Sequence, residues 1–254
     1  MINKDKIINI KNSILVGLFL LLFPFVSRVI ITVTNMDDSY GRFLQAGFFV
    51  IPILIVVILL ILKKLDKEKL MLVFNRRLKD YLYYIPVITI FIPVLIKGFQ
   101  WNGLSHFFGN LLLYLFVGIS EELYFRGIIP ALLEREFNRD WVIIISSLIF
   151  GIAHVTSAFV DPDPLIVIIT ILNALIFGFM AVCLRYKTKT IIPLMLIHFL
   201  FDFETKFIIL DGVGLNIAFG IRGALMFIYT IIIYILLKKE DENEQSNQQV
   251  QKQI

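Results

Sequence analysis

A small set of polar residues, most of them ionisable, lies inside apolar stretches of this sequence. An ionisable group at the centre of a membrane helix costs at least about 2.5 to 3.5 kcal/mol on insertion scales. Because of this cost, each such residue needs a reason to be there. One reason is function, since buried carboxylates and imidazoles carry protons in hydrolysis, in ion pathways and in proton transport. The residues concerned are Glu121, Glu122, His154, Asn173, His198 and Asp202.

The two adjacent glutamates have different local partners. Glu122 lies four residues before Arg126, so on a helix the two side chains share a face and can form an internal ion pair. Glu121 points about 100° away from Glu122 around the same helix and has no local partner of this kind. The pattern therefore predicts a structural role for Glu122 and Arg126, and it leaves Glu121 available for chemistry.

The spacing of the histidines places them near the glutamates. The polar connection 134–140 is centred near position 137.5, and Glu121 and His154 each lie 16.5 positions from that centre. In an antiparallel pair of helices, residues equidistant from the turn lie at equal depth, because both helices rise about 1.5 Å per residue. His198 and Asp202 are four residues apart and share a helix face. We expect one shared chamber that serves as a reaction or ion site; the alternative is a set of satisfied hydrogen bonds between helices.

The elements that carry these residues are predicted to be membrane helices. Of the 254 residues, 58% are hydrophobic and only 17% are charged, which excludes disordered, collagen-like and disulfide-rich chains and argues against a soluble domain. The composition predicts an all-α polytopic membrane protein with about eight transmembrane helices that enclose an intramembrane polar chamber. The expected spans are 13–33, 43–62, 82–96, 104–133, 141–158, 165–184, 191–209 and 215–237.

Basic residues between the spans predict the orientation. Nineteen of the 24 Lys and Arg residues lie at the two ends or in alternate connections, four lie in the other connections, and Arg28 lies within the first span. The positive-inside rule then places both termini in the cytoplasm. We expect one membrane domain over residues 1–239, with a motif-bearing core at 104–210, and a polar, disordered cytoplasmic tail at 240–254. The basic loops indicate contact with the lipid bilayer and no nucleic acid, and the oligomeric state stays open.

At these positions the sequence resembles the CAAX protease and bacteriocin-processing (CPBP/Abi) family of intramembrane proteases. The three motifs of that family, EExxxR, FxxxH and HxxxN/D, occur here in order within residues 121–202, each on a predicted membrane span. The short loops and the composition are typical of its bacterial members, which implies a bacterial cell membrane protein. Glu121, Glu122 and Arg126 match the first motif, Phe150 and His154 the second, and His198 and Asp202 the third.

The residue types and the resemblance together indicate hydrolysis of peptide bonds by an activated water. Glu121 is the expected general base, and His154 is expected to help hold the attacking water. His198 is the expected oxyanion donor, and Asp202 beside it is a second donor if burial keeps the acid neutral. The expected supporting residues are Glu122, Arg126, Phe150 and Asn173, of which Phe150 can equally be plain packing.

A metal is an alternative way to activate the water. One glutamate and two histidines match the ligand set of a catalytic zinc site, which would consist of Glu121, His154 and His198. The favoured expectation is that these side chains bind the water directly and that no cofactor is required, with Zn²⁺ as the alternative.

The predicted function is an intramembrane endopeptidase that acts on peptides or membrane proteins. The resemblance allows maturation of secreted peptides, self-immunity against bacteriocins and CAAX-type processing, and the bacterial features favour the first two. Two alternatives come from other classes: a non-proteolytic membrane regulator or scaffold that retains the fold, and a proton-coupled transporter that uses the same carboxylates.

Overall fold

The computed structural model describes residues 4–90, 92, 98, 100–159, 163–209 and 212–253. These residues form helices and connections without a β-strand, which confirms the all-α prediction. The elements are α1 (Lys4–Val33), α2 (Asp38–Ile61), η1 (Leu78–Tyr84), α3 (Ile85–Thr89), α5 (Leu104–Glu122), η2 (Leu123–Ile128), α6 (Ile129–Leu133), α7 (Arg139–Ala153), η3 (His154–Phe159), α8 (Pro164–Thr188), α9 (Ile192–Glu204) and α10 (Gly212–Gln253).

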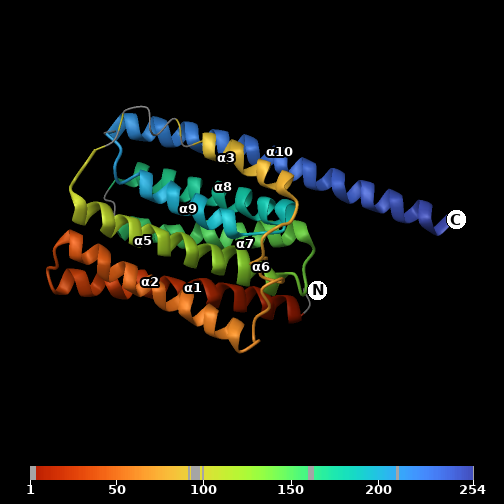
Figure 1. Cartoon of the computed structure of the whole chain (residues 1–254), viewed down its shortest axis with the longest axis horizontal. Helices are drawn as coiled ribbons and strands as arrows, with labels where there is room; N and C mark the ends of the chain where they lie inside the picture. The colour runs from red at the N-terminus through yellow and green to blue at the C-terminus, as the bar shows by residue number, and fades with distance from the viewer. Residues whose placement is uncertain are drawn as a thin grey trace.

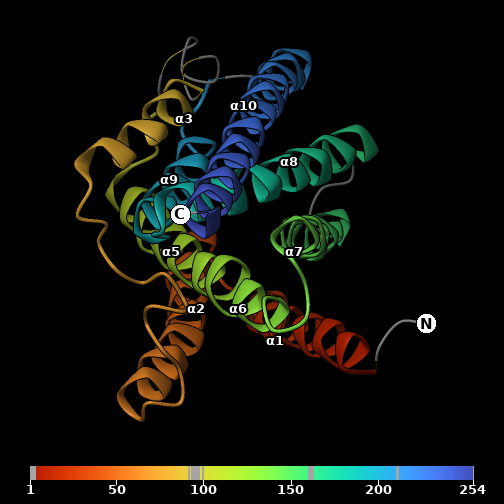
Figure 2. The same ribbon diagram turned by 90° about the vertical axis from the view of Figure 1, so that its right-hand side faces the viewer.

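The helices are stacked in layers along the vertical direction of Figures 1 and 2. The layer with α1 and α2 lies at the bottom, followed by α5, α6 and α7, then by α8 and α9, with α3 and α10 at the top. The closest pairings between layers join α2 with α5, α5 with α9, α7 with α8, and α8 with α10. The helices that carry the motifs therefore occupy the two middle layers.

Among the described residues, five helices are long and apolar enough to cross a membrane. The expected number of about eight is not confirmed: the span expected at 82–96 lies partly outside the described residues, and other segments are short or divided. The span expected at 104–133 is divided into α5, η2 and α6, and α9 has only 13 residues. A helix of that length rises about 20 Å, less than the hydrocarbon thickness of about 30 Å. The five helices are Lys4–Val33, Asp38–Ile61, Arg139–Ala158, Pro164–Thr188 and Val213–Glu244.

The outer faces of these helices are apolar. Large aliphatic and aromatic side chains such as Leu18 and Phe25 on α1, Leu54 on α2 and Phe227 on α10 are exposed. A soluble monomer rarely exposes apolar surface on this scale, whereas a lipid bilayer covers it. Several apolar helices with such faces are the structural sign of a membrane protein.

Both termini lie at the same end of the bundle (Figure 1). The connections rich in Lys and Arg meet there too: Ile191 donates its backbone N–H to the carbonyl of Met71, and Arg139 pairs with Asp241 of α10 at 2.6 Å. The structure thus gathers on one side the basic segments that the sequence places in alternate connections. That this side is the cytoplasm stays a prediction.

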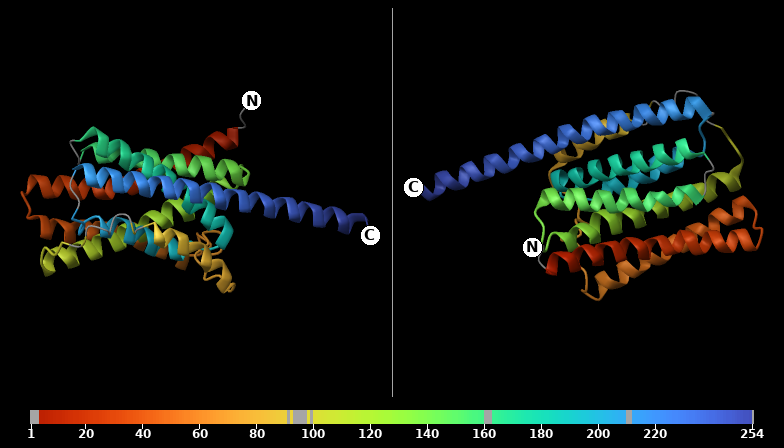
Figure 3. Two further views of the ribbon diagram at one scale, coloured as in Figure 1. Left: turned by 90° about the horizontal axis from the view of Figure 1, so that it is seen from above. Right: turned by 180° about the vertical axis from the view of Figure 1, so that it is seen from behind.

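The last helix is longer than its apolar part. α10 has 42 residues and projects beyond the bundle at its C-terminal end (Figure 3). It continues as helix past residue 239, where the sequence analysis expected a disordered tail to begin. The division of the chain into a membrane domain and a tail stays a prediction.

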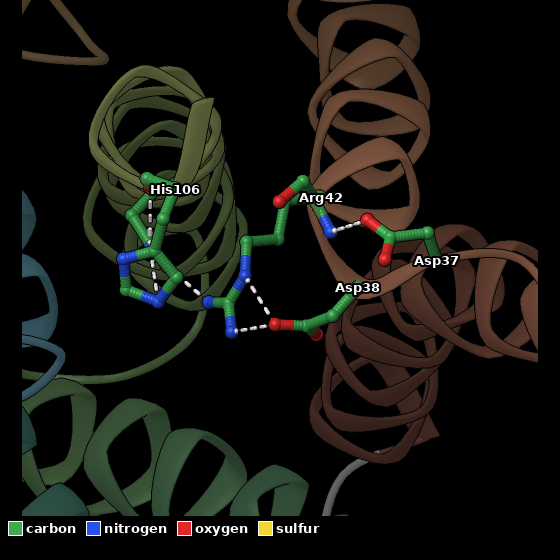
Figure 4. A network of polar contacts seen from close by, with 6 residues as sticks. Asp37, Asp38, Arg42 and His106 are labelled. Carbon is green, nitrogen blue, oxygen red and sulfur yellow. Dashed lines mark hydrogen bonds and ion pairs between the residues drawn. The ribbon is translucent and has the colours of Figure 1, made fainter. Parts of the chain in front are cut away.

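Polar contacts fix the helices at both ends of the bundle. At one end Arg42 of α2 donates to Asp38 at 3.0 Å and contacts Asn110 of α5, whose amide donates to the carbonyl of His106 at 2.7 Å (Figure 4). At the opposite end the fully buried Arg185 of α8 pairs with Glu134 at 2.6 Å, just after α6. These contacts hold the helices that flank the motif residues in register.

The close approach of α5 and α9 depends on Gly118. A Cβ atom at this position would lie 2.7 Å from the backbone nitrogen of Phe199 and 2.8 Å from the carbonyl oxygen of Met195. Both neighbours are backbone atoms of α9, so they cannot move aside as a flexible side chain can. Glycine therefore lets the helix that carries Glu121 and Glu122 touch the helix that carries His198.

We expect Gly118→Ala to push α5 and α9 apart and to destabilise the protein by about 1 to 3 kcal/mol, the usual cost of overpacking. Thermal unfolding of the purified protein in detergent measures this. Gly47→Ala in α2 is the matched control, because its Cβ would meet no atom within 4 Å. Equal unfolding temperatures for the two variants would contradict the close approach.

Candidate active site

The imidazole of His198 lies at the centre of the polar cluster. His198 is 4% exposed, and its Nδ1 lies 2.7 Å from Oε1 of Glu122. Because a carboxylate accepts, Nδ1–H is the donor of that hydrogen bond. On the other side of the ring, Nε2 lies 3.6 Å from Oε2 of Glu121 and 3.6 Å from Oδ2 of Asp202. The structure thus brings the first and third motifs together at one ring.

Glu122 and Arg126 form the ion pair that their spacing predicts. Nη1 of Arg126 lies 3.1 Å from Oε1 of Glu122, and both side chains are fully buried. The guanidinium also packs over the rings of Phe150 at 3.8 Å and Phe177 at 5.1 Å, a cation–π arrangement that stabilises a desolvated cation. The contact of Glu122 with His198 was not expected, because the four-residue spacing reports only partners on the same helix.

The helix changes its winding directly after the glutamates. Residues Leu123–Ile128 form the π-helical turn η2 between α5 and α6. Such turns contain an extra residue per turn and occur often at functional sites, since they rotate the side chains that follow. Arg126 lies in this turn and still contacts Glu122. The hydrophobic pattern of 104–133 gave no sign of this change.

His154 lies at the end of α7, where η3 begins. Its Nδ1 is 3.0 Å from the carbonyl oxygen of Phe150. A carbonyl can only accept, so Nδ1 carries the hydrogen and Nε2 of the neutral ring is left as an acceptor. The ring of Phe150 also lies between this site and Arg126, 4.6 Å from the His154 ring and 5.9 Å from that of His198. Phe150 therefore contacts three motif side chains in addition to the core.

The register of the α5–α7 hairpin agrees with the prediction from the sequence. Phe125 and Phe150 each lie 12.5 positions from the centre of the connection, and their rings are 5.0 Å apart. By the same symmetry Glu121 and His154 are expected at similar depth. Equal distance from the turn thus identifies Phe125 and Phe150 as side chains that meet across the hairpin.

Glu121 is the carboxylate of the cluster with the most unused bonding capacity. Its Oε2 atom is buried and has no hydrogen-bond partner among the described residues. Its side chain is 17% exposed, whereas that of Glu122 is fully buried. A buried acceptor without a partner costs free energy unless a water or a ligand completes it. Glu121 is therefore poised to accept a hydrogen bond from a bound water.

A cavity of about 400 Å³ adjoins the cluster, within the range of small-ligand pockets. His154, His198 and Asp202 lie on its wall, and further lining residues come from α7, α8, α9, α10 and the segment that follows α9. Asn173 of α8 also lines it and donates to the carbonyl of Phe219 in α10 at 3.3 Å. The expected chamber thus exists, and Asn173 serves both as a lining residue and as a bond between helices.

The sequence analysis missed a second buried ion pair on this wall. Arg222 of α10 lies on the cavity, 2.7 Å from Glu204 of α9, and both side chains are 9% exposed. The sequence analysis singled out neither residue. Since the two residues lie on different helices 18 positions apart, no helical spacing links them. The charge of Glu204 inside an apolar segment was the available signal.

Asp202 is more open to solvent than the sequence analysis assumed. Its side chain is 36% exposed, so burial does not supply a reason for a neutral acid at this position. The geometry still places its carboxyl group at the cavity beside Nε2 of His198.

The expected zinc ligands are not arranged as a metal site. Among the described residues, no group of three or more His, Cys, Asp or Glu side chains is placed to hold a metal ion. Nδ1 of His198 is already bonded to Glu122, and 3.6 Å separates its Nε2 from Glu121. The side chains do not fit a shared metal as they lie, so no reaction step is derived through one.

Arg126→Ala should destabilise the protein strongly, because it leaves the buried charge of Glu122 without its cation. Breaking a buried pair costs about 3 to 5 kcal/mol in soluble proteins. Lys238→Ala is the control, since its pair with Asp140 is partly exposed and surface pairs of this kind contribute little to stability. Thermal unfolding in detergent compares the two. An Arg126→Ala variant as stable as the wild type, with only its activity lost, would assign Arg126 to the reaction.

Comparison with known proteins adds one match. Residues 103–203 match the family model of the Rce1-like type II CAAX prenyl endopeptidases. No curated protein matches the chain. The matched segment contains α5 to α9 and with them every motif residue named above. The resemblance to the CAAX protease and bacteriocin-processing family of intramembrane proteases is therefore confirmed over residues 103–203, the part of the chain that builds the site.

Proposed function

We propose that the protein is an intramembrane endopeptidase in which side chains activate a water for attack on a peptide bond. The family match supports protease activity at the level of the family. The observation that carries the proposal is the position of His198, whose two ring nitrogens face the carboxylates of all three acidic motif residues at the edge of a cavity.

Glu121 is proposed as the general base. Its Oε2 lacks a protein partner and faces Nε2 of His198 at 3.6 Å. A water bound there would donate to the carboxylate and pass its proton to it during attack on the carbonyl carbon. The proton would then be available for the leaving amine, so that the base acts as an acid in the second half of the reaction.

His154 is proposed to position the same water. Its Nδ1–H is held by the backbone carbonyl of Phe150, which fixes the ring and leaves Nε2 as an acceptor. Its place on the cavity wall supports this role. Two fixed acceptors orient one water better than a single carboxylate can.

His198 is proposed to stabilise the oxyanion that forms when water attacks. Glu122 holds the ring from the buried side, and the other nitrogen points toward the cavity side of the cluster. A ring that carries hydrogen on both nitrogens would donate to the oxyanion through Nε2. A donor that is already fixed in place, away from bulk water, contributes several kcal/mol to such a reaction.

The substrate class follows less directly. The matched family is named for CAAX prenyl endopeptidases. We propose that the substrates are peptides or membrane proteins that reach the cavity, with peptide maturation and bacteriocin immunity preferred over CAAX processing on the bacterial character of the sequence. A cavity of about 400 Å³ accommodates only a short stretch of chain around the scissile bond.

Glu121→Gln should reduce cleavage by at least about 10²-fold, because the amide keeps the shape but takes no proton from water. Mass spectrometry of peptides in cells that express the wild type or the variant identifies the products. Purified proteins then cleave an internally quenched peptide built on those products. Glu68→Gln, in an exposed connection, is the control for loss of a carboxylate.

If purified Glu121→Gln cleaves the peptide as fast as the wild type does, Glu121 is not the general base. If neither protein cleaves any peptide, flux measurements in liposomes separate the alternatives. Proton-coupled flux that depends on Glu121 would favour the transporter, and absence of both activities would favour the regulator or scaffold.

Substitution of Asp202 tests whether this side chain donates a hydrogen bond to the oxyanion, because an asparagine amide can donate and an ionised aspartate cannot. If Asp202 donates to the oxyanion, Asp202→Asn retains most activity, since its amide can donate too, and Asp202→Ala loses on the order of 10²-fold. Rates measured against pH for both variants and the wild type check this. A large defect in the Asn variant would instead assign Asp202 to the orientation of His198 as an ionised acceptor.

A further inference from the structure

A second, larger pocket lies at the end of the bundle where the termini and the basic connections meet. Its volume is about 950 Å³. Segments far apart in the sequence form its walls: the stretch that leads into η1, η1 and the start of α3, the first residue of α7, the end of α8 and the part of α10 between residues 229 and 244. It is separate from the candidate active site, because the two pockets share no lining residue.

Basic side chains from three segments converge on this pocket. Arg77 and Lys79 come from the segment before and within η1, Arg139 begins α7, and Lys187 and Lys189 lie at the end of α8. Arg77 and Lys79 are exposed, and neither forms an ion pair with any residue that the structure describes. The pocket therefore holds cations that have unused capacity for an anion.

Acidic residues of α10 pair with two of the other three cations, Arg139 and Lys187. Arg139 donates twice to Asp241, at 2.8 Å and 2.6 Å, and Lys187 contacts Glu240. A fork-to-carboxylate contact of this kind is the geometry in which a guanidinium also binds phosphate. Asp241 and Glu240 thus lie where an external anion would be expected to bind.

The walls of the pocket change from polar to apolar along its length. On α10 the lining residues pass from Ile232 and Leu236 to Glu240, and on the η1 side from Leu82 back to Lys79. Tyr83, Tyr186 and Tyr229 lie at the transition, where aromatic residues with a polar end sit at a membrane–water interface. A free phosphate would use only the charged half of such a pocket, whereas a lipid would use both halves.

We propose that this pocket binds an anionic phospholipid, with the phosphate at the basic residues and the start of the acyl chains against the apolar part of α10. Basic pockets between membrane helices bind such headgroups through charge-assisted hydrogen bonds. The acidic residues of α10 compete with the headgroup for Arg139 and Lys187. This inference does not depend on the proposed protease activity.

Native mass spectrometry of the full-length protein in detergent tests the proposal. The protein is titrated with dioleoyl phosphatidylglycerol and, in parallel, with dioleoyl phosphatidylcholine as the lipid without net charge. We expect one phosphatidylglycerol to be retained at concentrations at which phosphatidylcholine is not, and excess inorganic phosphate not to displace it. Equal retention of the two lipids overturns the proposal, and displacement by phosphate would show that the pocket recognises the free anion instead.

Paired variants locate the site. R77Q/K79Q should weaken phosphatidylglycerol binding on the order of 10-fold, since each basic residue near an anionic headgroup contributes to affinity. K67Q/R76Q is the matched control, because it removes the same charge from exposed residues of the same connection that do not line the pocket. E240Q/D241N should instead strengthen binding several-fold by freeing Arg139 and Lys187. Equal affinities of the first two variants, or weaker binding by the third, contradict the assignment.

Discussion

The buried carboxylate of Glu122 is the interaction on which the rest of the site depends. It contacts Arg126 on its own chain segment and His198 on α9, and all three side chains are almost or fully buried. An anion in such surroundings is tolerated only when cations and hydrogen-bond donors complete it. Arg126 must therefore stay in the π turn, α9 must stay close enough for His198 to donate, and Gly118 must leave room for that approach. The positions of the motif residues follow from how this one charge is satisfied.

Much of this arrangement could be predicted from the sequence, where local periodicity applied. The Glu122–Arg126 pair follows from a four-residue spacing, and the α5–α7 register follows from symmetry about a short connection. Neither rule reaches across helices that are not adjacent in the chain. The hydrogen bond from His198 to Glu122 joins α9 to α5, which are not adjacent in the chain. The pair of Arg222 with Glu204 joins two consecutive helices at positions unequally far from their connection, so neither rule predicts it.

The predicted number of membrane spans shows a second limit of prediction from sequence. Hydropathy finds apolar stretches, but it does not show where winding changes or where a helix stops. The stretch 104–133 is apolar enough to be taken as one span and yet contains a π turn, and α9 ends at Glu204, inside the stretch expected to run to residue 209. Both interruptions lie beside the acidic residues of the motifs. Irregular backbone inside a membrane protein is tolerated where it is buried in protein or lines a cavity, which is where these segments lie.

The three motif carboxylates differ in solvent exposure, and the one that is paired with an arginine is the most buried. Glu122 is fully buried and has Arg126; Glu121 has no guanidinium of its own and is 17% exposed; Asp202, also without one, is 36% exposed. Glu122 is thus the carboxylate that a protein cation holds, and it joins η2 and α9 through Arg126 and His198. The same order separates structural from chemical roles, because Glu121 and Asp202 keep some exposure to solvent and can exchange a proton with a bound water. Solvation thus assigns Glu122 to holding the site together and leaves Glu121 and Asp202 as the groups that can act on what enters it.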